Sequence, residues 1–416
     1  MKKNNQIHFA FLGIPSRGHT IPTLCLVKSL IASGCKITYF NTEAFKSLIE
    51  EAGAKFVDYS SESLSNISLP ISLMEPHQVT IELQKIFFVS TLEILPILSA
   101  YHENKAFDVV IYDQMALWGQ IFADKFNLLS FCSNTMFLFS SEDIINLLPK
   151  FISNLDTDYN DKFNLLKCTT SKLESYKDVL DIQTATKSNY IITYYSPALL
   201  TPSHNFDNNK IIYLGNRFDS NYTASTVELT TESMIYISLG TVFNEKIDLF
   251  KAFISTFATT KHQVIISAGY NESIYKLLKN QNTNSNIHIY KFVDQLEVLS
   301  KASLFITHAG FNSIYEGLYF TVPMLMIPHT PEQYFNASRI KELNAGYLLD
   351  QEEIYSNGMS RVMADIEKDW KIYKTSSIKI RQSFLHSSDT VAVTATIKNI
   401  VKSHKVEPPR VYTRGI

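Results

Sequence analysis

Residues 7–40 read IHFAFLGIPSRGHTIPTLCLVKSLIASGCKITYF, and this stretch carries every part of a parallel βαβ unit. The apolar runs at 7–12 and 36–40 predict two buried strands. Residues 21–33 between them carry apolar side chains at helical spacing, and Gly34 ends that helix. Because parallel strands need a crossover connection, the stretch predicts the first crossover of a parallel α/β domain.

The same alternation of strand and helix patterns continues through the chain. Runs of strand length recur in the first half at 55–59, 107–112, 128–132 and 190–194, and in the second half at 234–239, 263–267, 287–292, 304–307 and 323–327. Residues 216–233 are polar and rich in Thr and Ser, which is typical of a linker. The predicted fold class is α/β, with two facing Rossmann-like domains, each a doubly wound parallel sheet, over residues 1–215 and 234–388. The C-terminal segment 389–416 begins with an amphipathic helix that either crosses back to the first domain or caps its own.

Composition excludes several classes of protein. The chain has 416 residues, 45% of them hydrophobic, which supports two sizeable cores, and its formal net charge of -2 leaves no global field for nucleic acid. Its cysteines, Cys25, Cys35, Cys132 and Cys168, form no CxxC pair and are expected to be free thiols in a reducing compartment. The start resembles a signal peptide, but its apolar run is only about eight residues and lacks a small-residue cleavage site. Since no run of about 18 apolar residues occurs either, we expect a cytoplasmic protein without stable membrane insertion. The sequence does not determine its oligomeric state.

The second half of the chain carries polar groups at several predicted strand ends, where the ligands of such domains bind. In SLGT (238–241), Gly240 lets a ligand approach the backbone and Thr241 can donate to a phosphate oxygen. In ITHAGFNSIYEG (306–317), Gly310 permits a tight turn. Asn312 and Ser313 suit a helix start, whose free N–H groups and partial positive charge favour a diphosphate.

Further polar side chains flank this helix start and the next one. His308 precedes the turn and could donate to the same phosphates, and Glu316, one turn into the helix, could accept from ribose hydroxyls. In PHTPEQYFNA, adjacent Glu332 and Gln333 offer acceptors and a donor for sugar hydroxyls. The alternative interpretations are structural: the asparagine only caps a helix, His308 is an ordinary loop histidine, and Glu332 belongs to a solvated helix start.

The order of SLGT, FVDQ, HAGFNS…E and P…EQ…N resembles the donor-binding half of the UDP-dependent glycosyltransferases. The likeness is greatest to their bacterial macrolide-type branch, whose two-Rossmann architecture is called GT-B, and it extends over essentially the whole chain. The resemblance implies contacts with the diphosphate, ribose, sugar and base of the donor. The diphosphate would be held by His308, Asn312 and Ser313, and the ribose by Glu316. The sugar would be held by Glu332 and Gln333, and the base by Gln295 with the backbone of Val293.

The base-binding corner departs from the family pattern. The family usually has Trp-X-Pro-Gln where this chain has Phe292-Val293-Asp294-Gln295. Phenylalanine still offers an aromatic face for stacking on the base, although a smaller one without an indole N–H. Asp294 in place of proline is expected to loosen the turn and to add a charge.

Chemistry is expected from a histidine and an aspartate of the first half. His19 lies in the loop PSRGHTIP after the first strand, and Asp113 ends the strand FDVVIYD, so both lie at the cleft edge of the sheet. An imidazole with a pKa of about 6.5 can accept the proton of an alcohol, and a carboxylate can hold its other nitrogen. The resemblance points to the same pair, with the base in GHxxP and a strand-end aspartate as its partner.

The reaction implied by the resemblance is a single in-line displacement at the anomeric carbon with inversion. UDP would leave toward the helix start and His308. No carboxylate cluster resembles a DxD metal site, so we expect no metal and no cofactor besides the UDP-sugar co-substrate. The loop GIPSRG differs from GxGxxG, which argues against a dinucleotide site.

The acceptor is expected against the first domain. Residues 70–100 and 134–153 are apolar and aromatic and are interrupted by prolines. One interpretation is a hydrophobic acceptor pocket with Phe87, Phe88 and Phe137 in its wall, and ordinary core helices are the other. A membrane-docking surface has little support, since basic residues are sparse there.

The leading hypothesis is an inverting glycosyltransferase that moves glucose, or a related hexose, from a UDP-sugar to a hydroxyl of a macrolide, polyketide or phenolic natural product. One alternative keeps the fold for nucleotide-sugar epimerisation or for glycosylation of a lipid. Another is a nucleotide-sugar-binding protein without catalysis, and the intact His19 and Asp113 argue against it.

Overall fold

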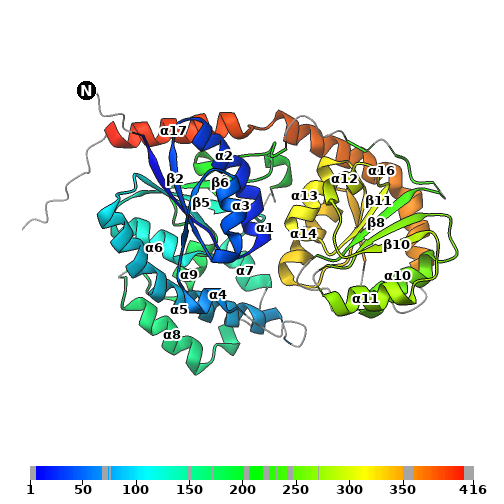
Figure 1. Ribbon diagram of the computed structural model, residues 1–416, viewed down its shortest axis with the longest axis horizontal. Coiled ribbons are helices and arrows are strands. Elements are labelled where there is room, and N and C mark those ends of the chain that lie inside the picture. Colours follow the sequence, from blue (N-terminus) through cyan, green and yellow to red (C-terminus); the bar gives the residue numbers. More distant parts are fainter. Residues whose placement is uncertain are drawn as a thin grey trace, which may run out of the picture.

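The structure, a computed structural model, consists of two α/β domains side by side, each built on a parallel sheet (Figure 1). The four cysteines are free. No helix among the described residues is both long enough and apolar enough to cross a membrane. The structure describes residues 6–67, 74, 76–147, 152–170, 172–200, 206–218, 224–225, 227–230, 232–240, 247–269, 271–349 and 359–406.

The first domain is built on a seven-stranded sheet in the order β3-β2-β1-β4-β5-β6-β7, with all neighbouring strands parallel. Both faces of β1 are buried, since Ala10 and Leu12 enter one core and Phe9 and Phe11 the other. The strands are β1 (His8–Leu12), β2 (Lys36–Asn41), β3 (Lys55–Asp58), β4 (Val109–Asp113), β5 (Leu129–Asn134), β6 (Tyr190–Thr193) and β7 (Ile211–Tyr213). The helices are α1 (Arg17–Thr20), α2 (Leu24–Ala32), α3 (Lys46–Glu51), α4 (Glu62–Ser65), α5 (Pro76–Asn104), α6 (Leu117–Lys125), α7 (Ser141–Leu147), α8 (Thr157–Lys167) and α9 (Tyr176–Gln183).

The second domain is built on a six-stranded sheet in the order β10-β9-β8-β11-β12-β13, again with parallel neighbours. Its strands are β8 (Met234–Ser238), β9 (Gln263–Ser267), β10 (Ile287–Tyr290), β11 (Leu304–Thr307), β12 (Met324–Met326) and β13 (Gly346–Leu348). Its helices are α10 (Ile247–Phe257), α11 (Glu272–Gln281), α12 (Gln295–Leu299), α13 (Phe311–Tyr319), α14 (Pro331–Glu342) and α16 (Met359–His386). The chain therefore forms two doubly wound sheets, as its alternating pattern predicts.

The structure differs from the predicted elements in two respects. Each predicted run contains a strand, but the edge strands β7 and β13, of three residues each, lie outside the predicted runs. The helix expected over 21–33 is present but begins with a 3-10 turn at Ile21–Thr23, and it is α-helical as α2 from Leu24 to Ala32. Pro22, which has no N–H to donate, lies in that turn.

The C-terminal helix belongs spatially to the first domain. From α16, which covers the second domain, the chain passes into α17 (Thr390–Val406), which runs across the first domain beside α2 (Figure 1). Val393 and Ile397 of α17 lie in the first-domain core. Ser29 Oγ on α2 donates to the carbonyl of Thr390 at 3.1 Å. Of the two courses open to this helix, the structure has the one that crosses back.

An aromatic cluster joins the two domains. The ring centroid of Phe137 lies 5.1 Å from that of Phe311 and 6.1 Å from that of Phe335. Phe139 lies 4.4 Å from Phe335. Arg339 on α14 donates to a first-domain backbone carbonyl after β6 at 2.6 Å. These contacts hold α13 and α14 of the second domain against the loops that follow the first-domain strands.

Candidate active site

The first wall of the site is formed where β1 and β4 lie side by side. Their register pairs Leu12 with Tyr112, so the loop after β1 and the end of β4 meet at the same edge of the sheet. His19 lies on α1, directly after that loop, and Asp113 is the last residue of β4. Nδ1 of His19 lies 2.8 Å from Oδ2 of Asp113. Two residues far apart in the sequence thus meet as a pair.

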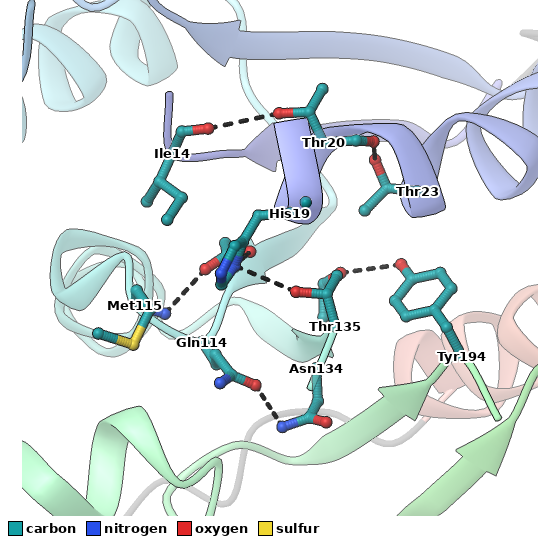
Figure 2. Close-up of polar contacts among 12 residues, drawn as sticks. Ile14, His19, Thr20, Thr23, Gln114, Met115, Asn134, Thr135 and Tyr194 are labelled. Atoms are coloured by element: carbon teal, nitrogen blue, oxygen red, sulfur yellow. Dashed lines mark hydrogen bonds and ion pairs between the residues drawn. The ribbon is translucent and has the colours of Figure 1, made fainter. Parts of the chain in front are cut away.

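Asp113 orients the imidazole of His19. An ionised carboxylate can only accept, so Nδ1 carries the hydrogen and Nε2 keeps its lone pair. The other carboxylate oxygen accepts from the backbone N–H of Met115 at 2.9 Å, and the hydroxyl oxygen of Thr135 lies 3.1 Å from His19 Nδ1. Figure 2 shows Met115 and Thr135 on opposite sides of the ring. No described residue bonds to Nε2, which leaves this nitrogen for a substrate.

The pKa of His19 is raised above the ordinary value of 6.5. Burial of the ring lowers this pKa, but the adjacent Asp113 carboxylate, assisted by the charge of Glu332 from the second domain, favours the imidazolium more strongly. Asp113 is only 2% exposed, so water screens its charge weakly. The environment therefore makes His19 a stronger base than a histidine in water.

Buried polar side chains hold the segment that carries His19. Thr20 Oγ1 donates to the carbonyl of Ile14 at 3.3 Å, and Asn41 Nδ2 donates to the same carbonyl at 3.1 Å. Thr23 Oγ1 donates to the carbonyl of Thr20 at 2.7 Å (Figure 2). These bonds tie α1 to β1 and β2, so the imidazole is presented from a fixed backbone.

The second wall is formed at the ends of β8 and β11, whose register pairs Ser238 with Thr307. His308 directly follows β11, and its ring lies between two glycines. A Cβ at Gly240 would come 2.7 Å from the ring, and one at Gly310 would come 2.4 Å from its Nε2. Gly240 also has a φ of +83°, which L side chains rarely adopt. The histidine ring itself therefore requires glycine at both positions, in addition to any role that these glycines have in letting a ligand approach.

His308 is a neutral imidazole at pH 7. Burial lowers the pKa of His308 to about 4. Its Nδ1 is buried and bonds to none of the described residues. A neutral ring can still donate one hydrogen bond to a phosphate oxygen, but it contributes no positive charge. Any charge on a departing diphosphate must therefore be balanced by other groups.

The start of α13 differs from its expected form. Gly310 is the N-cap, so Asn312 and Ser313 lie inside the first turn and neither of them caps the helix. The backbone N–H groups of that turn are the free donors of a helix start. The side chain of Asn312 instead reaches the first domain, because its Nδ2 donates to the carbonyl of Gly18 at 2.8 Å. Gly18 directly precedes His19, so one hydrogen bond connects the two walls.

Gln295 and Glu316, predicted to contact base and ribose, hydrogen-bond to each other. Nε2 of Gln295 donates to Oε2 of Glu316, and Oε1 of Gln295 accepts from the hydroxyl of Tyr236 at 2.9 Å. Burial raises the pKa of Glu316. The three side chains form one chain from β8 to α13, which fixes the orientation of the Gln295 amide.

The base-binding corner is firmer than the sequence indicates. Asp294 does not loosen the turn, because its carboxylate accepts from two backbone N–H groups at 3.1 Å and 3.2 Å and caps α12. Phe292 is 45% exposed and can offer its ring to a ligand. Val293 is partly buried between these two residues. The acidic residue thus supplies local order where the family has proline.

Glu332 and Gln333 have different surroundings at the start of α14. Oε1 of Glu332 accepts from Asn336 Nδ2, and burial raises the pKa of Glu332. Gln333 is buried, and its Oε1 accepts from the backbone N–H of His329 at 2.8 Å. The oxygen of Gln333 thus bonds within the helix start, which is buried at this residue and not solvated as the structural interpretation expects. No described residue bonds to the amide nitrogen of Gln333 or to the second oxygen of Glu332, so both can contact a ligand.

The remaining predicted contacts are less direct. Thr241, like Phe151 of the second aromatic stretch, lies outside the described residues. Phe87 and Phe88 pack in the first-domain core, and Phe137 packs in the cluster between the domains, with exposures of 3%, 0% and 1%. Core packing, the alternative interpretation, accounts for all three rings in this structure. Their contact with an acceptor stays a prediction.

Three residues of the site were not predicted: Thr135, Arg217 and Tyr236. Thr135 follows β5, so its position one strand beyond Asp113 was the signal that could have found it. Arg217 lies in the predicted linker, where its Nη1 donates to Oδ1 of Asn312 at 3.1 Å. Tyr236 reads as an ordinary strand residue, and no sequence pattern marks its hydroxyl.

The geometry combines a histidine–aspartate pair on one wall with a helix start on the other. His19 Nε2 and the first turn of α13 are connected through Gly18 and Asn312. Among the residues that the structure describes, no three His, Cys, Asp or Glu side chains gather where they could hold a metal ion. The arrangement suits removal of a proton beside a group that leaves as an anion.

Comparisons with known proteins agree with this geometry. Residues 213–392 match the family model described as UDP-glucoronosyl and UDP-glucosyl transferase. The chain is 28% identical over 396 residues to a Bacillus subtilis protein named uncharacterized UDP-glucosyltransferase YdhE, covering 94% of this chain and 98% of the other. It is 24% identical to the demethyllactenocin mycarosyltransferase of Streptomyces fradiae, over 88% of this chain and 81% of the other. The solved structure of the kitacinnamycin glycotransferase superposes with a TM-score of 0.78 at 20% identity, covering 95% of this chain and 99% of that one, and shows the same fold.

Proposed function

We propose that the chain moves a hexose, in the first instance glucose, from a UDP-sugar to a hydroxyl of a small hydrophobic acceptor. It belongs to the UDP-glycosyltransferases of GT-B fold, in their macrolide-glycosyltransferase-like branch. Macrolides, polyketides and phenols are the acceptor classes to test. The observation that carries the proposal is the His19–Asp113 pair, one residue away from a contact with the start of α13. A base and an anion-binding helix start are what an in-line transfer requires.

In the proposed reaction, His19 Nε2 takes the proton of the acceptor hydroxyl as its oxygen attacks the anomeric carbon. The bond from that carbon to the β-phosphate oxygen breaks, and its electron pair leaves with UDP. The anomeric configuration inverts because attack and departure occur on opposite faces. Asp113 stabilises the imidazolium that forms, at 2.8 Å from Nδ1, as the carboxylate of a catalytic triad does.

The donor is proposed to lie along the second domain. Backbone N–H groups of the first turn of α13, with His308, receive the diphosphate, and Glu316 receives the ribose. The free oxygen of Glu332 and the amide nitrogen of Gln333 receive hydroxyls of the sugar. Glu332 also acts electrostatically on His19, which supports a sugar position between the two. No metal is required in this scheme, since hydrogen-bond donors and a cation can take its electrostatic role.

The test is incubation of purified protein with UDP-glucose and a panel of macrolides, polyketides and phenols, followed by mass spectrometry and by assay of released UDP. The expected product is heavier than its acceptor by one hexose residue and carries a β-linkage. Absence of product and of UDP release with every donor and acceptor would contradict the proposal. Interconversion of sugars without an acceptor would indicate an epimerase, and UDP binding without turnover would indicate a binding protein.

A further inference from the structure

Arg217, in the linker between the domains, has no acidic partner among the residues that the structure describes. Its charge nevertheless acts on Glu316. Its Nη1 donates to Oδ1 of Asn312 at 3.1 Å, and its Nε is buried and has no partner. Arg217 is partly buried, and a partly desolvated cation without a carboxylate partner favours an anion.

The position of Arg217 is fixed against α13. The carbon at the centre of its guanidinium lies 3.7 Å from the ring centroid of Tyr315, in cation–π contact. The backbone N–H of Arg217 donates to the hydroxyl of Tyr315 at 3.2 Å, and this hydroxyl donates to the carbonyl of Gly215 at 2.8 Å. Asn312, Tyr315 and Glu316 are spaced i, i+3, i+4 and share one face of the helix. Arg217 therefore lies along the face that begins at the helix start.

The proposed transfer creates a need for positive charge at this place. When the carbon–oxygen bond breaks, UDP departs with one more negative charge than it carried as a sugar ester. The helix start supplies about half a charge, and His308 is neutral. Arg217 is a full cation beside the first turn, and a planar guanidinium suits two phosphate oxygens.

Building on the proposed function, we infer that Arg217 binds the diphosphate of the nucleotide sugar and balances the charge that UDP gains as the sugar leaves. Asn312 then has two tasks. Its side-chain oxygen accepts from Arg217, and its side-chain nitrogen donates to the Gly18 carbonyl. A nucleotide sugar bound to Arg217 is therefore linked through Asn312 to the segment that carries His19.

The test compares UDP with uridine, which lacks the phosphates, by calorimetry on the full-length protein. We expect Arg217→Met to weaken UDP binding by about 10- to 100-fold and to leave uridine binding unchanged, because only UDP carries the anion. Arg217→Lys keeps a charge but loses the planar fork, so its loss of UDP affinity should be smaller. The salt dependence of UDP binding should also weaken in Arg217→Met.

Arg339→Met is the matched control, since Arg339 also joins the domains but donates to the carbonyls of Leu199 and Leu200. Its ratio of UDP to uridine affinity should equal that of the wild type. An unchanged ratio in Arg217→Met would overturn the inference and leave Arg217 a holder of Asn312 alone. If that variant does not fold, Arg217→Lys decides by the same ratio. Wild-type protein that bound UDP no better than uridine would overturn the proposed function as well.

Discussion

His19 and His308 occupy corresponding places on the two walls of the site, yet their surroundings differ in charge. Each follows a central strand of its sheet, β1 or β11, and each ring is largely buried. His19 has the Asp113 carboxylate at 2.8 Å, and its pKa is raised. His308 lies between two glycines with no carboxylate partner among the described residues, and burial lowers its pKa to about 4.

The comparison teaches that the neighbours, and not the residue type, set the role of each histidine. Burial lowers both pKa values, and only a nearby negative charge reverses that effect. The first wall thus provides a base that can hold a proton, and the second provides a neutral hydrogen-bond donor. A proton acceptor beside the acceptor alcohol and an uncharged donor beside the diphosphate fit the proposed division of labour.

The largest expected effect comes from Asp113→Asn, which removes the difference between the two histidines. We expect kcat to fall by about 10²- to 10⁴-fold, because the amide no longer fixes the tautomer or stabilises the imidazolium. Because the carboxylate that raises it most is gone, the pKa of His19 should fall. The acid limb of the kcat/KM profile, which lies above pH 6.5 in the wild type, should therefore move to lower pH.

Asp124→Asn is the control for this experiment, since it removes a carboxylate on α6 that bonds to Gln120 and Lys172 and not to His19. Its pH profile should match that of the wild type. An acid limb that stays in place in Asp113→Asn would mean that another group titrates.

An intermediate effect is expected on stability in acid, through His308. In the folded protein, burial lowers the pKa of His308 to about 4. As the pH falls below 6.5, the unfolded chain therefore takes up a proton at this ring, whereas the folded protein does so only near pH 4. The free energy of unfolding that His308 contributes is complete above pH 6.5. About 2–3 kcal/mol of it should be lost by pH 4.5.

Urea unfolding at pH 7 and pH 4.5 measures this loss, which His308→Gln should diminish by that amount. His386→Gln, at an exposed site on α16, is the matched control and should leave the acid sensitivity unchanged. Equal acid sensitivity of wild type and His308→Gln would show that this ring is not the buried neutral group described here.

The smallest effect is expected from Thr135→Val, which removes the hydroxyl at 3.1 Å from His19 Nδ1 and keeps the shape of the side chain. Asp113 still holds the ring, so kcat should fall only about two- to tenfold. Thr193→Val on β6 is the control, because its buried hydroxyl bonds to no residue that the structure describes. A loss as large as that of Asp113→Asn would place Thr135, and not Asp113, as the chief support of the base.

Much of the fold and one wall of the site follow from local patterns. Parallel strands end at a shared edge, so chain order alone predicts that the loop with His19 meets Asp113. The edge strands β7 and β13 were not predicted, whereas β12, also of three residues, lies in the fully buried apolar run 323–327. The apolar spacing over 21–33 predicted the helix, and its 3-10 first turn contains Pro22, which has no N–H to donate.

The second wall was harder to predict because its bonds join distant residues. Asn312 looked like a helix cap, but it bonds to Gly18, 294 positions earlier in the chain. Gln295 and Glu316 looked like separate contacts for a ligand, and they pair with each other. Motif spacing identifies which residue types lie near a ligand, but side-chain pairing depends on how the two domains and their strands pack.

The division between a catalytic first wall and a donor-binding second wall is tested most directly in His19→Ala. Turnover with UDP-glucose and the affinity for UDP are measured on the same preparation. The account predicts that kcat falls by at least about 100-fold, while UDP affinity stays nearly that of the wild type. Retained turnover, or a loss of UDP affinity that parallels the loss of kcat, would contradict it.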